Sequence, residues 1–469
     1  MTASRRVPES DTLLPPIEPF RVKAVEAIHR TTRVEREAAL ARAHFNLFHL
    51  DAEDVLVDLL TDSGTAAMSA RQWSALLEGD ESYAGSASFK RFHTVVGEIF
   101  GFEHILPVHQ GRAAERLMIG SLCMPGDAVP GNTHFETTRG NLLSFRVQPV
   151  DLPSPEFWQF REALPFKGNM DTVALERFLG STERGKVPFI LLTLTNNTCG
   201  DQPVSMENIR EIHSLASRYG ILLYFDACRF AENAWFIHER ERGFAERSIR
   251  DIVKEMFSYA DGCLFSAKKD GLAHIGGFFA TRSEHVAERA RQQLLLCEGF
   301  LTYGGVTGRD LETIAVGLRE VLEEDYLRYR VDTTSYLAGR LIEEGIPVLL
   351  PPGGHAVYLD AAKLVPHLGA RENPGQALAI EIYREGGVRT VRLILAPGPE
   401  ARKQECVEMV RLALPARVYT RNHLDYAARV VGNVARRATE IQGVRTISAP
   451  PLLGGFLARY DREAECHDA

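Results

Sequence analysis

Short apolar runs alternate with amphipathic segments through the middle of the chain, and this alternation constrains the fold more than any other feature. The apolar run 187–195 precedes an amphipathic segment at 206–219, which is followed by a second apolar run at 221–225. A third run follows at 262–265. Strands and helices that alternate at this spacing form a mainly parallel sheet with helices on both faces. The sequence therefore predicts an α/β fold.

The 469 residues are enough for more than one domain. A long helical stretch over 309–344 leads to a second α/β unit that contains the apolar runs 356–360 and 407–414. A further helical pattern over 22–44 and a predicted strand over 55–60 precede the large domain. We predict an N-terminal arm with part of a small domain, then a large domain, then the rest of the small domain, over 1–60, 61–320 and 321–469.

Composition excludes several classes of protein. A net charge of −8 argues against a dedicated nucleic-acid surface. The sequence has no apolar run long enough to span a membrane, and its start does not resemble a signal peptide. Seven cysteines without CxxC spacing indicate neither a zinc site nor a disulfide framework. The cysteine pattern favours a protein of the reducing cytoplasm.

Charged residues follow two of the predicted strands, Asp226 and Arg229 after one and Lys268-Lys269 after the next. The carboxyl ends of parallel strands meet at one edge of a sheet. An amine and a carboxylate at such an edge suit pyridoxal phosphate (PLP), whose aldehyde bonds to a lysine and whose ring nitrogen pairs with an acid. Singly, Lys269 can be a solvated strand end, Asp226 a helix cap, and Arg229 its ion-pair partner on one helical face.

Four other positions fit the same cofactor and its substrate. The turn 109–112 precedes a predicted helix whose N–H groups can hold a phosphate, and Gly111 permits close approach. Phe135 can stack on a pyridine ring or belong to the core. Asn197 can bind the ring oxygen and a substrate carboxylate, or act as a turn residue. Arg411 can bind a carboxylate bidentately, or be an edge arginine with a buried stem.

Six ordered segments, spread over nearly the whole chain, resemble the tryptophanase and tyrosine phenol-lyase family of PLP-dependent β-eliminating lyases. They are 59–65, 83–86, 109–112, 202–206, 229–234 and 266–270. The resemblance implies PLP fold type I, the architecture of aspartate aminotransferase, with a large mainly parallel domain and a smaller α/β domain. It also implies a homotetramer, a dimer of dimers, that eliminates a β-substituent from an L-amino acid.

The same resemblance assigns roles to individual residues. Lys269 would carry PLP and remove the α-proton, while Asp226 and Arg229 tune the ring. The phosphate would be held by Gln110, Gly111, Arg112, Ser266 and Lys268, the ring stacked by Phe135, and the substrate carboxylate bound by Thr61, Ser63, Asn197 and Arg411. A proton donor, Tyr83, would come from a neighbouring subunit, with Tyr303 lining the site; interface packing is the alternative for both. Main-chain oxygens of Gly64, Glu81 and His274 would bind a monovalent cation, usually K⁺.

The positions that would recognise the leaving group depart from both relatives. Leu393 stands where the phenol enzyme has an arginine, and Arg392 points elsewhere if the strand alternates. Glu136 replaces a threonine of the phenol enzyme and an aspartate of tryptophanase, and Gly455 replaces a histidine of tryptophanase. Two further pocket positions do match tryptophanase, Phe300 and Val391.

The predicted substrate is therefore neither tyrosine nor simply tryptophan. One alternative is β- or γ-elimination on a non-aromatic amino acid with a thiol or halide leaving group. Another PLP reaction, such as transamination, is a second alternative, and a non-catalytic binding protein is a third.

Overall fold

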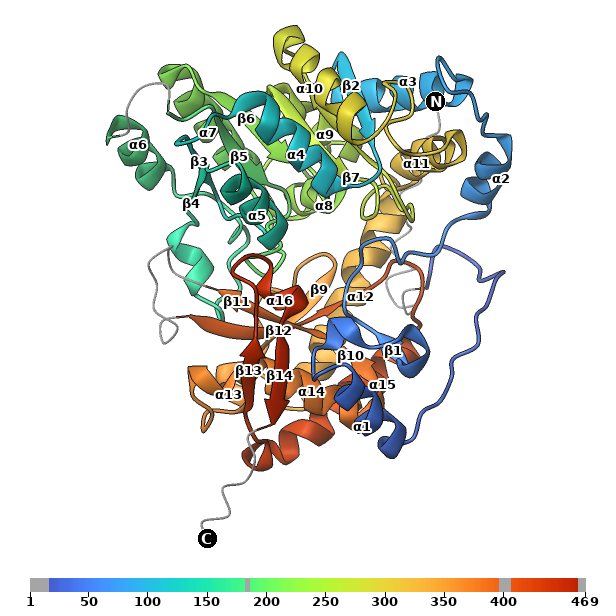
Figure 1. Ribbon diagram of the computed structural model, residues 1–469, viewed down its shortest axis with the longest axis vertical. Helices are drawn as coiled ribbons and strands as arrows, with labels where there is room; N and C mark the ends of the chain where they lie inside the picture. The colour runs from blue at the N-terminus through green and yellow to red at the C-terminus, as the bar shows by residue number, and fades with distance from the viewer. Residues whose placement is uncertain (1–16, 182–185, 396–405, 463–469) are drawn as a thin grey trace.

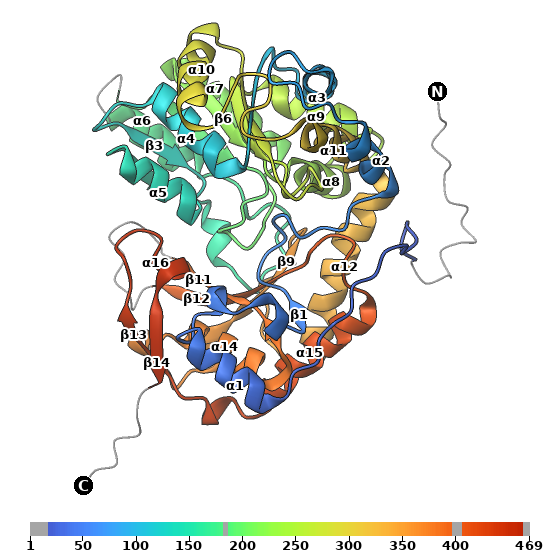
Figure 2. The ribbon, with the colours of Figure 1, turned by 45° about the vertical axis from the view of Figure 1, so that its right-hand side comes forward.

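The computed structural model describes residues 17–181, 186–395 and 406–462. It has two halves that meet along a broad junction, one built on a seven-stranded sheet and the other on smaller sheets (Figure 1). Helix α12 (Glu324–Glu343) runs from one half to the other (Figures 1 and 2).

The large sheet has the strand order β2-β8-β7-β6-β5-β3-β4. All of its neighbouring strands are parallel except for β8, which is antiparallel to β2 and to β7. The predicted mainly parallel α/β sheet is therefore confirmed. Its strands are β2 (His104–Val108), β3 (Ala128–Gly131), β4 (Gln148–Asp151), β5 (Phe189–Thr193), β6 (Leu222–Asp226), β7 (Gly262–Ser266) and β8 (Gly277–Thr281).

Apolar residues on each face of this sheet pack against a different set of helices. Successive side chains of a strand point to opposite faces, so β5 sends Ile190 to one core and Leu191 to the other. The first core includes α3 (Ala87–Phe100), α7 (Met206–Tyr219), α8 (Phe230–Arg240), α9 (Ile249–Ser258) and α11 (Gly308–Glu320). The second includes α4 (Gly111–Leu122) and α10 (Glu284–Cys297), with α5 (Glu136–Ser144) beside α4. The remaining helices of this half are α2 (Ala70–Glu78) and α6 (Thr172–Ser181).

The other half joins both ends of the described chain. An antiparallel sheet of order β11-β12-β9 packs near a parallel pair, β1 with β10, so that a strand near residue 57 lies beside one near residue 388. Helix α1 packs on α14, and both contribute to one core. The elements are α1 (Arg33–Arg42), β1 (Val57–Asp58), β9 (Ala356–Asp360), α13 (Ala361–Leu364), α14 (Pro374–Gly386), β10 (Val388–Arg389), β11 (Val391–Leu395), β12 (Val407–Ala413), α15 (Arg421–Arg436), β13 (Val444–Ser448), α16 (Gly454–Leu457) and β14 (Arg459–Arg462).

Three expected elements differ in extent from the structure. The helix expected over 22–44 is confined to α1, because the Thr32 side chain and Glu35 form a capping box that starts it there. The expected strand at 55–60 is paired only over β1. The long helical stretch 309–344 is divided into α11 and α12.

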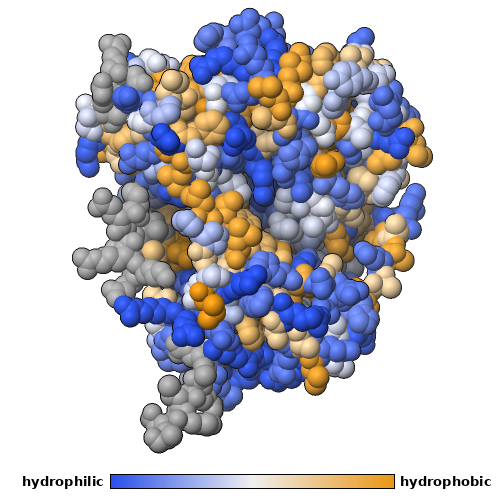
Figure 3. Space-filling view, in the orientation of Figure 1, coloured by the Kyte–Doolittle hydropathy of each residue, from blue (hydrophilic) through white to orange (hydrophobic). Residues whose placement is uncertain are grey.

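Among the described residues no helix is both long and apolar enough to cross a membrane. In the space-filling view, hydrophobic and hydrophilic residues interleave where the two halves meet (Figure 3). A cavity lies at this junction, and most of the site residues predicted from the sequence line it.

Candidate active site

The cavity has a volume of about 270 Å³ and lies at the carboxyl ends of β5, β6 and β7. In doubly wound sheets this edge is where ligands bind. The structure brings the following predicted site residues together around it: Thr61, Ser63, Gln110, Gly111, Arg112, Phe135, Glu136, Asn197, Asp226, Arg229, Ser266, Lys268, Lys269 and Arg411.

Asp226 and Lys269 reach the cavity from adjacent strands. Asp226 is the last residue of β6 and pairs in parallel register with Leu264 of β7. Lys269 lies in the turn after β7, where its backbone N–H donates to the Ser266 carbonyl at 3.3 Å. The Asp226 carboxylate accepts from the Cys228 backbone N–H at 3.2 Å, which fixes the acid at the strand end. An amine and an acid thus face one enclosed space.

The turn between β2 and α4 can accept a phosphate. Gln110 has extended backbone at the start of α4, and Gly111 is the first residue of this 12-residue helix. A Cβ at Gly111 would lie 2.6 Å from Cβ of Ser266, so only glycine fits between the helix start and the end of β7. Free N–H groups and the positive end of the helix dipole point into this space. The residues present therefore fit PLP, whose phosphate Gln110, Gly111, Arg112 and Ser266 would hold.

Lys268 lies beside Lys269 and packs against the loop after β1. Burial, and then the neighbouring Lys269 and Arg112, lower the pKa of its ammonium group. The Gly64 N–H donates to the Lys268 carbonyl at 2.7 Å, and a Cβ at Gly64 would lie 2.5 Å from the Lys268 side chain. The cluster of positive charge suits a phosphate dianion.

Arg411 enters the cavity from β12, on the opposite half of the molecule. Its guanidinium donates to the Asn197 side-chain oxygen at 3.1 Å and to the Leu60 carbonyl at 3.0 Å. Its Nε is buried without a partner in the part of the chain that the structure describes. The Tyr358 hydroxyl donates to the Asn197 carbonyl at 2.9 Å. Arg411 and Asn197 are thus held side by side, as a pair that binds a carboxylate requires.

Arg229 forms an ion pair with Asp62, which was not among the site residues predicted from the sequence. Its Nε and Nη2 donate to the two carboxylate oxygens of Asp62 at 3.0 and 2.8 Å, and both side chains are 5% exposed. Burial alone would raise the pKa of Asp62, but Arg229, His355 and Arg330 lower it well below its usual range. Asp62 stands between two predicted substrate residues, Thr61 and Ser63, so its position in the motif could have identified it.

Glu115 is a second lining residue without a sequence prediction. It lies one turn into α4 and accepts hydrogen bonds from the Thr137 and Thr138 hydroxyls at 3.2 and 2.9 Å. Burial, and then the charge of Asp226, raise the pKa of Glu115 to about 7. Its spacing of four from Gly111 places both on one helical face, which is the signal that sequence reasoning could have used.

The far end of the cavity is lined by apolar groups and one acid. Phe48 packs against Phe456 with ring centroids 4.7 Å apart, and Val391 and Leu393 line the same end. No sequence motif identifies Phe48 or Phe456 as a residue of the site. Burial raises the pKa of Glu136 against the opposing effect of Arg411 and Arg392.

Arg392 lines the cavity beside Leu393, but its guanidinium is turned to Glu408. Its register partner on β12 is Val410, whereas Val391 pairs with Arg411 and Leu393 with Met409. The Arg392 Nε donates to the Glu408 carboxylate at 2.9 Å, and a second guanidinium nitrogen also contacts that carboxylate. This guanidinium is committed to an ion pair and is no substitute for an arginine at Leu393.

The remaining predicted site residues do not line this cavity. Tyr83, which is 68% exposed, stacks on Phe300 at 5.2 Å and lies 5.5 Å from the Tyr303 ring. Gly64 and His274 are neighbours, since a Cβ at Gly64 would lie 2.9 Å from the His274 carbonyl oxygen. Glu81 forms an ion pair with Arg309 at 2.8 Å.

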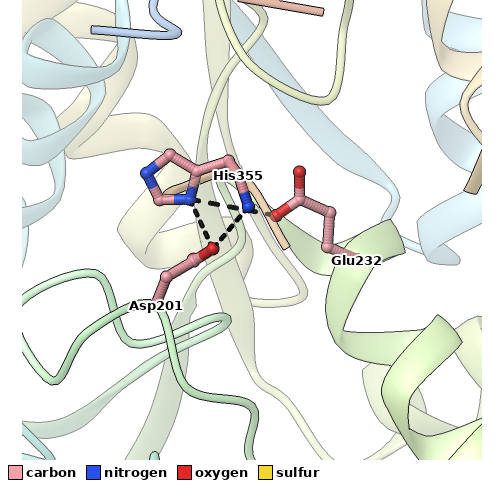
Figure 4. Close-up of side chains that lie close together, drawn as sticks. All are labelled: Asp201, Glu232 and His355. Carbon is pink, nitrogen blue, oxygen red and sulfur yellow. Dashed lines mark hydrogen bonds and ion pairs between the residues drawn. The ribbon is translucent and has the colours of Figure 1, made fainter. Parts of the chain in front are cut away.

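Three buried titratable residues that do not line the cavity, Asp201, Glu232 and His355, point toward one another (Figure 4). His355 Nδ1 lies 2.6 Å from Asp201 Oδ2, whereas two ligand atoms on one zinc ion lie about 3.3 Å apart. Glu232 is already paired with Arg330 at 3.0 Å. Burial, and then Arg229, lower the pKa of His355 to about 4. The group is therefore a buried polar network, in which Glu232 pairs with Arg330 and an uncharged His355 contacts Asp201.

Comparison with known proteins agrees with this geometry. Residues 58–429 match the beta-eliminating lyase family. A tryptophanase of Hyphomonas neptunium is 50% identical over 450 residues, which cover 95% of this chain and 99% of that protein. A tyrosine phenol-lyase of Symbiobacterium thermophilum is 45% identical over 449 residues, covering 95% and 98%. In fold, the chain is similar to a serine palmitoyltransferase of Sphingomonas wittichii, with a TM-score of 0.57 and 16% identity over 87% of this chain and 97% of that one.

Proposed function

The chain belongs to the beta-eliminating lyase family, and from this premise we propose that it removes a β-substituent from an L-amino acid other than tyrosine, and not simply tryptophan. It is a PLP-dependent lyase with the type I fold. The products of such a reaction are pyruvate, ammonia and the protonated leaving group. The observation that carries the proposal is the approach of Lys269 and Asp226 to one cavity from adjacent strands.

Each part of the reaction has residues suited to it. PLP, when bound, supplies an electron sink for the negative charge that develops at the α-carbon. Lys269 takes the α-proton, and Asp226 keeps the ring nitrogen protonated. Arg411 and Asn197 orient the substrate carboxylate, with Thr61 and Ser63 at the edge of the same space. Tyr83 of a neighbouring subunit donates a proton to the leaving group.

The leaving-group end of the cavity supports the exclusion of tyrosine. A phenol or phenolate oxygen is bound best by a free cation, and Leu393 offers none. Arg392 is engaged with Glu408 instead. Glu136 faces this end as an acceptor, so a neutral leaving group that donates a hydrogen bond is favoured over an anionic one.

Four further expectations belong to the same proposal. We propose a cytoplasmic homotetramer, with Tyr83, Phe300 and Tyr303 gathered at a surface that a second subunit covers. The main-chain oxygens of Gly64, Glu81 and His274 bind K⁺ when the neighbouring subunit is in place. The domains divide at residues 60 and 320, as the sequence predicts.

The decisive experiment follows pyruvate and ammonia from a panel of L-amino acids with purified, PLP-loaded protein. Wild type is expected to release both in equal amounts, and Asp226→Asn to lose turnover by on the order of 10²-fold or more while it still binds PLP. Lys269→Ala should lose the absorbance band of lysine-bound PLP. A keto acid that retains the whole side chain would instead indicate transamination, and a wild-type protein that does not bind PLP would indicate a non-enzyme.

A further inference from the structure

A second cavity of about 240 Å³ continues from the leaving-group end of the first. Five residues line both cavities, and they form the passage between them: Phe48, Glu136, Val391, Arg392 and Gly455. Gly455 keeps this passage open, because a Cβ there would lie 3.1 Å from the Glu136 carboxylate. The two cavities therefore adjoin at these five residues.

PLP and the carboxylate of the amino acid, which are common to every substrate complex, would occupy most of the first cavity. Its volume of about 270 Å³ must hold the PLP ring, the phosphate at Gly111 and the amino-acid carboxylate at Arg411. A complete ligand site usually encloses roughly 300–1,000 Å³. A β-substituent larger than the space beside Val391 and Leu393 would therefore extend past Glu136 into the second cavity.

The lining of the second cavity defines what it can accept. Its apolar surface is contributed by Leu47, Phe48, Ala370, Val391, Ile394, Ala449 and Ala458. Arg392 and Glu408 neutralise each other across it, at 2.9 Å. The Thr390 hydroxyl is fully buried and has no hydrogen-bond partner within the described ranges. Such a lining suits an uncharged, mainly apolar group with a polar atom, and disfavours an ion.

We propose that the second cavity holds the distal part of the substrate's β-substituent, so that the enzyme acts on L-amino acids with an extended, uncharged substituent. The inference rests on the proposed β-elimination. In the reaction, Lys269 takes the α-proton, a Cα–Cβ double bond forms, and the bond from Cβ to the substituent breaks with its electron pair on the leaving group, which then takes a proton. One water hydrolyses the resulting aminoacrylate to pyruvate and ammonia. The released group is left in the second cavity, next to the passage at Glu136.

A series of cysteine thioethers isolates substituent length from leaving-group chemistry. S-methyl-, S-benzyl- and S-(2-naphthylmethyl)-L-cysteine all break a Cβ–S bond and release a thiol, pyruvate and ammonia. Two variants narrow the second cavity without touching the first, Ala370→Phe and Ala449→Phe. Ile447→Phe is the matched control, because Ile447 is 53% exposed on β13 and lines neither cavity.

The readout is the ratio of kcat/KM for the naphthylmethyl substrate to kcat/KM for the methyl substrate. We expect this ratio to be above one in wild type, to fall by about 10-fold or more in Ala370→Phe and Ala449→Phe, and to keep its wild-type value in Ile447→Phe. A ratio below one in wild type, or one unchanged in both filled variants, would overturn the inference while β-elimination stands. If none of the three thioethers gives pyruvate, and β-chloro-L-alanine gives none either, the proposed function fails and the inference with it.

Discussion

Arg229 and Asp62 form a two-point ion pair at the floor of the active-site cavity, with both side chains 5% exposed. Asp62 lies in the loop after β1 and Arg229 at the start of α8, so the pair joins segments 167 residues apart. Arg330 of α12 lies 3.8 Å from the same carboxylate. The orientation of the Arg229 guanidinium therefore depends on a residue that is 167 positions away in the sequence.

Removal of Asp62 should destabilise the protein strongly. Asp62→Ala leaves the Arg229 charge buried without its partner, which costs about 3–5 kcal/mol of unfolding free energy. Urea unfolding of the PLP-free protein measures this loss. Glu176→Ala is the control, since its pair with Arg218 is half exposed on both sides and should contribute no more than about 1 kcal/mol. Equal losses in the two variants would contradict a buried, two-point pair.

Substitution of Arg411 should weaken substrate binding more than catalysis. Arg411→Ala removes the guanidinium that Asn197 orients, and a hydrogen-bonded charge of this kind contributes about 1.5–3 kcal/mol. We expect KM for the amino acid to rise on the order of 10- to 100-fold with a smaller change in kcat, and the affinity for PLP to stay within about 3-fold of wild type. If PLP affinity falls and KM does not, Arg411 binds the cofactor instead of the substrate.

A single methyl group at Gly111 should weaken cofactor binding. The Cβ of Gly111→Ala would lie 2.6 Å from Ser266 Cβ, and such overpacking costs about 1–3 kcal/mol. The dissociation constant of PLP, measured by titration of the PLP-free protein, should rise about 10-fold or more. Gly339→Ala in α12 is the matched control, because its added Cβ meets nothing within 4 Å. A normal PLP affinity in Gly111→Ala would show that the phosphate lies elsewhere.

Glu115 should make stability fall as pH rises. Its pKa is raised from 4.5 to about 7 by burial and then by Asp226, so the folded state holds a proton that the unfolded state has released between these values. Stability from this group is thus present below pH 4.5 and is lost as pH rises through about 7. The shift corresponds to about 3 kcal/mol at most.

Glu115→Gln keeps an acceptor for the two threonine hydroxyls and removes the titration. Its unfolding free energy, compared with that of wild type at pH 5 and pH 8 without PLP, should gain up to about 3 kcal/mol relative to wild type at the higher pH. Burial also raises the pKa of Asp270 to about 7. Asp270 is present in both proteins, so its contribution to the pH dependence cancels in the comparison. Parallel pH profiles would mean that Glu115 titrates normally.

The sequence alone determined the α/β class, the parallel character of the large sheet and the position of Asp226 and Lys269 at strand ends. These follow from local patterns: strand and helix periodicity, and the rule that parallel strands end at one edge. Helix α7 was predicted to the residue, because Ser205 caps its start and Gly220 adopts the left-handed conformation at its end.

Only the tertiary structure determined the contacts between segments that are far apart in the sequence, because no local sequence pattern encodes them. The pairing of β1 with β10, the Asp62 partner of Arg229, and the passage between the two cavities at Glu136 and Gly455 all join segments more than 160 residues apart. Phe48 and Phe456 became neighbours for the same reason. Such contacts depend on how the two halves pack together, and the burial that raises the pKa of Glu115 exists only once α4, α5 and β6 enclose it.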